Sequence, residues 1–239
     1  MSTYLKRGIL RLQFASNLYL HENTFQTNKT LLKPTGEILA LCGNIGQPYC
    51  PKTRDFFKWA EEQYGQIFWI PGNLEYSAPS NSIATWNERA DQHYESIRNW
   101  ELTKTTFCQK LEYSVPYTNI TILASPIGIP HDIKRQIYVW SSTGNYKPID
   151  KDDYLRFFMN ELAWLDTKLQ KTTGPKLLLS NIPIYERAIT NIYGVANPRE
   201  AKTNSGGMPW SAVNMAGHSQ YRPDMIMEWV EKRKPITSV

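Results

Sequence analysis

Short apolar runs that end in polar turns recur along this chain of 239 residues. Ile9 to Ser16, Ile38 to Gly43 and Gln66 to Pro71 are apolar at most positions, which is typical of strands buried on both faces of a parallel sheet. Residues 51–64 carry an apolar face at helical spacing, and residues 82–100 are interpreted as a more polar helix that covers the surface. The first 100 residues therefore predict strands that alternate with helices, as in an α/β fold.

After residue 100 the pattern becomes rich in strands and then gives one long helix. The predicted strands are Phe107 to Val115, Asn119 to Ala124, Gln136 to Trp140, Lys176 to Ser180 and Met208 to Ala216. Asp150 and Asp153 form a capping-box-like start to the helix. Its apolar residues follow helical spacing and are predicted to lie in the core: Leu155, Phe158, Met159, Leu162, Leu165 and Leu169.

Between these elements, residues 189–207 are rich in Asn, Gly, Pro and Thr and are predicted to form a long loop. No repeat or linker divides the chain. We therefore expect one domain over residues 1–220, followed by a C-terminal tail over residues 221–239 that has room for a short helix.

Composition narrows the class of protein. An apolar fraction of 41% with eight Trp and fourteen Tyr is that of a globular chain, and its length allows a substantial core. A mean hydropathy of −0.49 and the lack of an apolar run near 18 residues predict no membrane insertion. The first residues lack the features of a signal peptide, and Cys42, Cys50 and Cys108 form no CxxC pair. Both observations predict a cytoplasmic protein with free thiols.

Charge adds little to this picture. The net charge is +5 and the isoelectric point is near 9.0, but the basic residues are scattered. The tightest cluster, Lys232-Arg233-Lys234, is short and is flanked by Glu231 and Pro235. We interpret it as a solvated tail, so nucleic acid is not expected as a partner.

Five predicted strands end in polar tips. In chain order the tips are Ser16-Asn17-Leu18-Tyr19, Gly43-Asn44, Gly72-Asn73-Leu74-Glu75, Leu179-Ser180-Asn181 and Gly217-His218-Ser219-Gln220. Because α/β folds place their sites at the C-terminal ends of parallel strands, we expect the tips to form one site.

This series of tips resembles the signature of the calcineurin-like metallophosphoesterase family. That signature reads, in the same order, D-x-H, G-D, G-N-H-E, a lone H after an apolar strand, and G-H-x-H. The resemblance extends from about Leu12 to Gln220. It implies the family's fold, a four-layer α/β/β/α sandwich, and a site built for two metal ions.

The first two tips have lost the charged ligands that the resemblance implies. Asn17 and Tyr19 stand where the family has the aspartate and the histidine of its first metal. Asn44 stands where the family has the aspartate that bridges both metals.

The later tips retain two matches to the family. Asn73 matches the family's amide ligand, and His218 matches a histidine ligand. Leu74 replaces the histidine that assists the leaving group, Asn181 replaces a histidine of the second metal, and Gln220 replaces the last histidine. His218 also has a simpler interpretation, as a hydrogen-bonded histidine with no ligand role.

Electrostatics argues against a two-metal centre. Two divalent ions about 3.5–4 Å apart repel by roughly 19 kcal/mol at an effective dielectric constant of about 20. A carboxylate near 2.1 Å from both ions returns roughly 30 kcal/mol on the same scale, whereas the carbonyl dipole of an asparagine returns far less. We therefore predict no bound metal, no cofactor and no catalytic residue.

The implied function is that of a catalytically inactive phosphoesterase homologue. It would act as a protein-interaction, scaffold or assembly component, in the cytoplasm or in a viral particle assembled there. Protein partners are therefore expected, and the aromatic residues proposed for such contacts are Trp86, Tyr94, Trp100, Tyr193 and Trp210.

Other readings stay open. The alternative enzyme is a metal-dependent phosphoesterase with one weakly held metal or a relocated site. Glu22 and Glu75 could serve such a site, although both are interpreted as solvated loop residues, and His131-Asp132 is a weak candidate for an acid–base pair.

Overall fold

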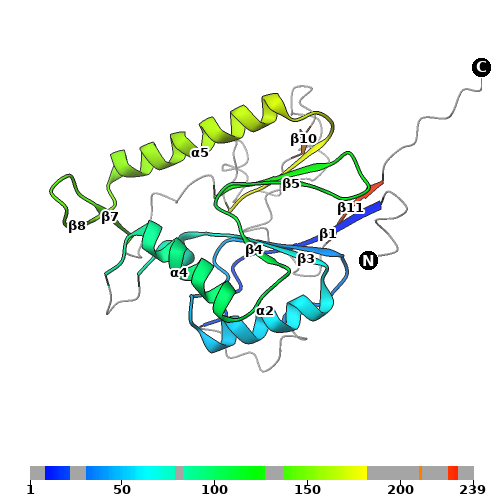
Figure 1. Cartoon of the computed structure of the whole chain (residues 1–239), viewed down its shortest axis with the longest axis horizontal. Helices are drawn as coiled ribbons and strands as arrows, with labels where there is room; N and C mark the ends of the chain where they lie inside the picture. The colour runs from blue at the N-terminus through cyan, green and yellow to red at the C-terminus, as the bar shows by residue number, and fades with distance from the viewer. Residues whose placement is uncertain are drawn as a thin grey trace, which may run out of the picture.

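The computed structural model describes residues 9–21, 31–78, 83–126, 137–181, 210–211 and 226–230, the last two ranges and Ile9 for their backbone alone. Helices and strands alternate through the described part of the chain (Figure 1). The prediction of an α/β fold with a parallel sheet is confirmed. Its assignment to the sandwich type of the calcineurin-like family stays a prediction.

The larger sheet has five strands in the order β11 (Ile226–Val230), β1 (Ile9–Ala15), β2 (Ile38–Cys42), β3 (Gln66–Ile70) and β4 (Thr105–Phe107). The strands β1 to β4 are parallel, and β11 runs antiparallel to β1. The C-terminal ends of β1 to β4 therefore meet at one edge of the sheet.

The smaller sheet has four strands in the order β10 (Trp210–Ser211), β9 (Lys176–Leu179), β6 (Thr121–Ala124) and β5 (Leu111–Ser114). The strands β6, β9 and β10 are parallel, and β5 pairs antiparallel with β6. Of the predicted strand over residues 208–216, only β10 lies within the described residues.

Helices cover the outer faces of both sheets. The helices α2 (Pro51–Gln63) and α4 (Trp86–Asn99) lie beside the larger sheet, and α5 (Lys151–Lys171) lies beyond the smaller one (Figure 1). A capping box begins α4 at Thr85 and another begins α5 at Asp150, which satisfies backbone N–H groups that the helix itself leaves unpaired. Within the described residues, no helix is both long and apolar enough to cross a membrane.

Alternating side chains on the strands build the core. On β3, Ile67 and Trp69 face the helices, whereas Phe68 and Ile70 face the smaller sheet. On β6, Ile122 faces the larger sheet, and Leu123 packs with Leu165 of α5. The strands β3 and β6 have apolar residues on both faces, and both of their faces are covered, which explains their continuous apolar runs in the sequence.

Two predictions about individual side chains were wrong. Leu155 and Met159 were predicted to lie in the core, but they are 50% and 55% exposed. The buried face of α5 instead carries Phe157, Glu161 and Leu165. Trp100 was expected at the surface, but it ends α4 and packs into the core beneath the helices.

Part of the predicted tail forms a strand. Residues 226–230 form β11, in which Trp229 pairs with Leu10 and Met227 pairs with Leu12. This pairing gives β1 a second neighbour, so β11 and not β1 is the outer strand of the sheet.

Candidate functional site

The predicted strand tips meet where the C-terminal edges of the two sheets approach each other. Asn17 follows β1, Asn44 follows β2, and Asn181 follows β9 after Ser180. The backbone N–H of Asn17 donates to the carbonyl of Gly43 at 2.9 Å. A methyl group at Gly43 would lie 3.0 Å from the Cβ of Asn181, so tips from both sheets are in contact. The prediction that these tips come together is confirmed for the described residues.

The orientation of the Asn44 amide follows from its partners. Its Oδ1 accepts the backbone N–H of Leu74 at 3.0 Å, which leaves Nδ2 facing Asn17. Nδ2 donates to Oδ1 of Asn17 at 2.8 Å. Both side-chain oxygens therefore accept N–H groups, and an NH₂ group lies between the two residues that the family resemblance matches to aspartates.

Backbone geometry explains why asparagine suits these turns. Asn17 and Asn44 have φ angles of 56° and 57°, in the left-handed region that Asn and Asp tolerate better than other side chains. Tyr19 has φ 45° and is held there by the bond from its N–H to the carbonyl of Asn44 at 3.1 Å. Leu74, which the family resemblance matches to a histidine, is fully buried.

Glu75 is the main feature that sequence reasoning missed. Its side chain is fully buried, and its carboxylate accepts five N–H groups. Four are backbone donors, at Asn44 (3.0 Å), Ile45 (2.7 Å), Gly46 (3.2 Å) and Gly72 (2.7 Å), and the fifth is the indole of Trp69 (3.4 Å). The prediction of a solvated loop residue was wrong. The spacing of Gly72 and Glu75 is that of a capping box, and this was the available signal.

Two side chains of α4, His93 and Arg89, lie close to Glu75. The ring of His93 stacks on Phe107 with centroids 4.8 Å apart, and its Nε2 lies 3.2 Å from the carbonyl oxygen of Glu75. That oxygen can only accept, so Nε2 carries the proton. Burial, with the nearby charge of Arg89, holds the pKa of His93 well below its usual 6.5, so the ring is neutral. We assign His93 a structural role.

Arg89 is the buried cation of this region. Burial lowers its pKa to about 10, and the charge of Glu75 opposes that change. Its guanidinium donates to Gln92 at 2.6 Å and also to Gln47. The loop after β2 is therefore held both by Glu75 and by α4.

The residues present do not fit a pair of divalent ions. Asn17 and Asn44 offer amide groups that are bonded to N–H donors, and both oxygens of Glu75 accept N–H groups. Among the residues that the structure describes, no three His, Cys, Asp or Glu side chains cluster as metal ligands would. His218, Gln220, Glu22, His131 and Asp132 lie outside the described residues, so their predicted roles stay predictions.

A second buried carboxylate lies at the start of β5 and the end of β6. Glu161 of α5 accepts a hydrogen bond from Oγ of Ser125 and pairs with Nζ of Lys110 at 3.2 Å. Burial raises its pKa above the usual 4.5, although Ser125 and Lys110 act against that rise. Because Lys110 directly precedes β5 and Ser125 follows β6, the cluster joins α5 to the smaller sheet.

Similarity to a solved structure supports the α/β fold of this chain. The chain matches no protein-family model and no curated protein. Among solved structures it is similar to the crystal structure of phosphopantetheinyl hydrolase from Mycobacterium tuberculosis, with a TM-score of 0.51. The two sequences are 12% identical, and the match covers 80% of this chain and 74% of that chain. At this identity the likeness shows the fold alone.

Proposed function

We propose that the chain is a catalytically inactive relative of the calcineurin-like phosphoesterases and acts through protein contacts, as a scaffold or assembly component. The likeness to phosphopantetheinyl hydrolase supports a phosphoesterase-like fold, and with it the four-layer α/β/β/α sandwich. The three free cysteines support a reducing compartment, so we place the protein in the cytoplasm or in a viral particle assembled there.

The hydrogen bond between Asn17 and Asn44 is the observation that carries this proposal. A bridging ligand must direct a lone pair at each of two cations, but Asn44 directs an NH₂ group at Asn17 and its oxygen at the N–H of Leu74. Turning the Asn44 amide over would break both bonds and place oxygen against oxygen. Even then the amide would bring no negative charge to offset the repulsion between the ions.

One observation favours the alternative of a single weak metal. The Oδ1 of Asn73 is buried, and no described residue donates a hydrogen bond to it. Asn73 matches an amide ligand in the family resemblance, so it and His218 are the residues that would hold one ion. Such a site would lack a carboxylate from the described tips and would bind weakly.

Metal content is the direct test. The purified chain is incubated with Mn²⁺ or Zn²⁺, dialysed and measured by elemental analysis, and hydrolysis of p-nitrophenyl phosphate is followed with added Mn²⁺. We expect less than one retained ion per chain and no hydrolysis above that of buffer. Two retained ions per chain would overturn the proposal, whereas one ion with activity that depends on His218 would favour the alternative.

Restoring charge gives a stricter form of this test. In the double variant Asn17→Asp, Asn44→Asp, the bond between the two side chains is replaced by carboxylates that repel each other. Tyr19, Leu74 and Asn181 are unchanged, so we expect neither two retained ions nor activity. Asn99→Asp, at an exposed position at the end of α4, is the matched control for added charge.

A further inference from the structure

A pocket of about 270 Å³ lies between α4, the hairpin of β7 (Tyr138–Trp140) and β8 (Tyr146–Pro148), and α5. Its lining residues are Trp86, Val139, Ile149, Asp153, Arg156, Phe157 and Asn160. Trp86 and Phe157 meet edge to face with ring centroids 4.3 Å apart, and they make an aromatic wall.

The size of the pocket limits what it can hold. An apolar cavity of about 150 Å³ binds benzene, and pockets for drug-sized ligands span about 300–1,000 Å³. A volume of about 270 Å³ therefore suits one large aromatic ring better than a whole cofactor. The apolar wall favours such a ring, and Asn160 offers it a hydrogen-bonding group.

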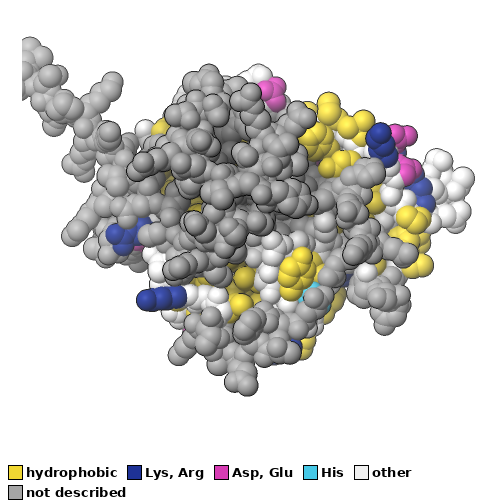
Figure 2. Space-filling view, turned by 180° about the vertical axis from the view of Figure 1, so that it is seen from behind, with side chains coloured by type: hydrophobic (Ala, Val, Ile, Leu, Met, Phe, Trp, Pro, Cys, Tyr) yellow, Lys and Arg dark blue, Asp and Glu magenta, His cyan; other side chains and the backbone are white. Residues whose placement is uncertain are grey.

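The surface around the pocket has the composition of a protein interface. Trp140 and Tyr146 stack on each other across the hairpin, with centroids 4.3 Å apart, and are 52% and 40% exposed. Leu155 and Met159 are exposed on the neighbouring helix. Figure 2 shows hydrophobic, basic and acidic side chains together at the right-hand side, where the hairpin end of the molecule lies. Trp, Tyr, Met and Arg are enriched in interfaces between proteins.

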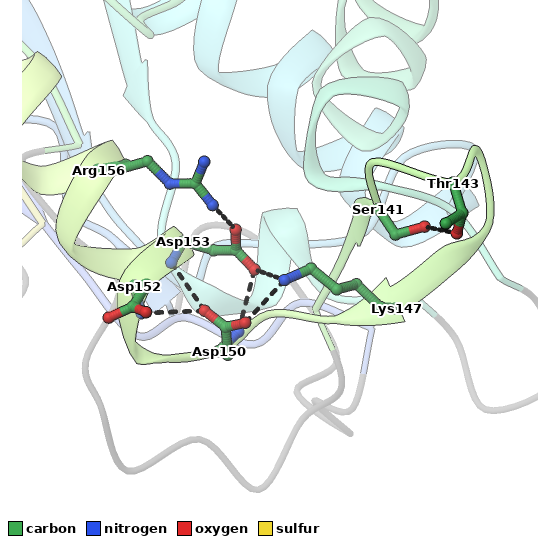
Figure 3. Close-up of polar contacts among 7 residues, drawn as sticks. All are labelled: Ser141, Thr143, Lys147, Asp150, Asp152, Asp153 and Arg156. Atoms are coloured by element: carbon green, nitrogen blue, oxygen red, sulfur yellow. Dashed lines mark hydrogen bonds and ion pairs between the residues drawn. The ribbon is translucent and has the colours of Figure 1, made fainter.

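The charged side chains at the rim of the pocket differ in their exposure to solvent. Asp153 lies between Lys147, at 2.7 Å, and Arg156, so two cations shield its carboxylate (Figure 3). The side chain of Asp153 is 10% exposed, whereas that of Arg156 is 75% exposed. Arg156 thus presents unused N–H donors to the solvent, next to an apolar pocket.

We propose that this pocket receives one aromatic side chain from a partner polypeptide, with an acidic neighbour of that side chain pairing with Arg156. The inference rests on the proposed function, because it names the contact surface that a non-catalytic module would use.

Short peptides test the pocket directly. We would titrate the ¹⁵N-labelled chain with acetyl-Glu-Trp-Glu-amide and follow its backbone and indole N–H signals by NMR. Saturable shifts are expected for residues around the pocket. Acetyl-Glu-Ala-Glu-amide and acetyl-Lys-Trp-Lys-amide should each bind at least tenfold more weakly, because the first lacks the ring and the second has the wrong charge.

Two variants of exposed residues on α5 separate the two contacts. Asn160→Trp fills the pocket from its rim and should weaken binding of the acidic peptide at least tenfold. Arg156→Glu leaves the aromatic wall intact; it should weaken the acidic peptide about tenfold and strengthen the lysine peptide. Thr167→Trp and Lys171→Glu, at exposed positions on the same helix, are the matched controls and should change binding less than twofold.

Other results would overturn the proposal. These are the absence of shifts at 5 mM acidic peptide, equal binding of the alanine peptide, and binding that neither variant changes. A dimer in sedimentation that Asn160→Trp dissociates would assign the pocket to a second copy of the chain instead. Metal content measured on the same samples separates the two proposals, because retention of two ions contradicts only the inactive site and lost peptide binding contradicts only the pocket.

Discussion

The carboxylate of Glu75 holds together two turns that carry no charge of their own. It accepts backbone N–H groups from the loop after β2 and from Gly72 after β3. Hydrogen bonds to a charged acceptor are stronger than neutral ones, and these are shielded from water. The geometry of the Asn44 turn therefore depends on Glu75 and requires no metal ion.

Replacing this carboxylate by an amide should strongly destabilise the fold. In Glu75→Gln one acceptor oxygen becomes an NH₂ group facing N–H donors, such as those of Asn44 and Gly72 at Oε2. Each buried donor left unpaired costs about 1–3 kcal/mol, so we expect a loss of about 2–5 kcal/mol in the free energy of unfolding. Urea denaturation followed by circular dichroism measures it.

Glu62→Gln provides the control for this measurement. Glu62 is exposed on α2, and its substitution should change the free energy of unfolding by less than about 0.5 kcal/mol. Equal effects at the two positions would show that Glu75 does not organise the turns.

The sequence predicted which residues reach the site but not how they bond. Strand periodicity placed Asn17, Asn44 and Asn181 at one edge, because parallel strands end at the same side of a sheet. The bond from Asn44 to Asn17 depends on the direction of an amide, and the N–H of Leu74, 30 residues further along the chain, decides that direction. No local pattern contains this information.

The helix α5 was predicted correctly, but the prediction of which of its faces is buried was partly wrong. Its bounds agree with the helical pattern, yet Leu155 and Met159 are exposed and Glu161 is buried. Helical spacing of apolar residues favoured burial of Leu155 and Met159. Nothing in the local sequence indicated that the ionisable Glu161 is buried. Ser125 and Lys110 supply the partners that make burial of Glu161 tolerable, and both are distant in sequence.

We expect the charge of Glu161 to matter less than its hydrogen bond. Burial is the main cause of its raised pKa, so ionised Glu161 gains little from being in the fold. Glu161→Gln keeps an acceptor for Ser125 and should change the free energy of unfolding at pH 7 by less than about 1 kcal/mol. Glu161→Ala leaves Ser125 unpaired beside a cavity and should cost about 2–4 kcal/mol.

Both variants can be measured by urea denaturation, with Glu112→Gln as the control. Glu112 pairs with Lys168 at the surface, where such a pair contributes little. A loss above about 3 kcal/mol for Glu161→Gln would show instead that the ion pair with Lys110 is a major stabilising contact.

At the scale of the whole molecule, stability should fall in mild acid because of His93. Its pKa in the fold is well below 6.5, so the unfolded chain binds the proton more tightly. The contribution of neutral His93 to the free energy of unfolding is fully present above about pH 6.5 and is lost as the pH falls below that value. Between pH 7.5 and 5.5 the expected loss is about 1 kcal/mol.

The variant His93→Phe identifies this contribution. Phe keeps an aromatic ring against Phe107 but cannot take up a proton, so the variant should lose about 1 kcal/mol less stability than the natural chain between pH 7.5 and 5.5. Asp150, whose pKa Lys147 lowers to about 2, titrates outside this window. Equal slopes for the variant and the natural chain, measured by urea denaturation at both pH values, would contradict the assignment.

The overall architecture was the most predictable level. Buried parallel strands and their covering helices follow from apolar runs and helical spacing, which are local in sequence. The strand β11 was not foreseen, because it pairs with β1 across more than 200 residues and its sequence is short. Long-range pairing of this kind depends on which sheet edge remains open.

The left-handed backbone at Asn17 and Asn44 has a consequence for the history of such a chain. With φ angles of 56° and 57°, both positions favour Asn, Asp and Gly over other side chains. Folding alone is then enough to keep an aspartate-like residue at each turn, without any help from catalysis. An Asn or Asp at these turns can therefore persist because of the backbone conformation, whether or not the site performs any chemistry.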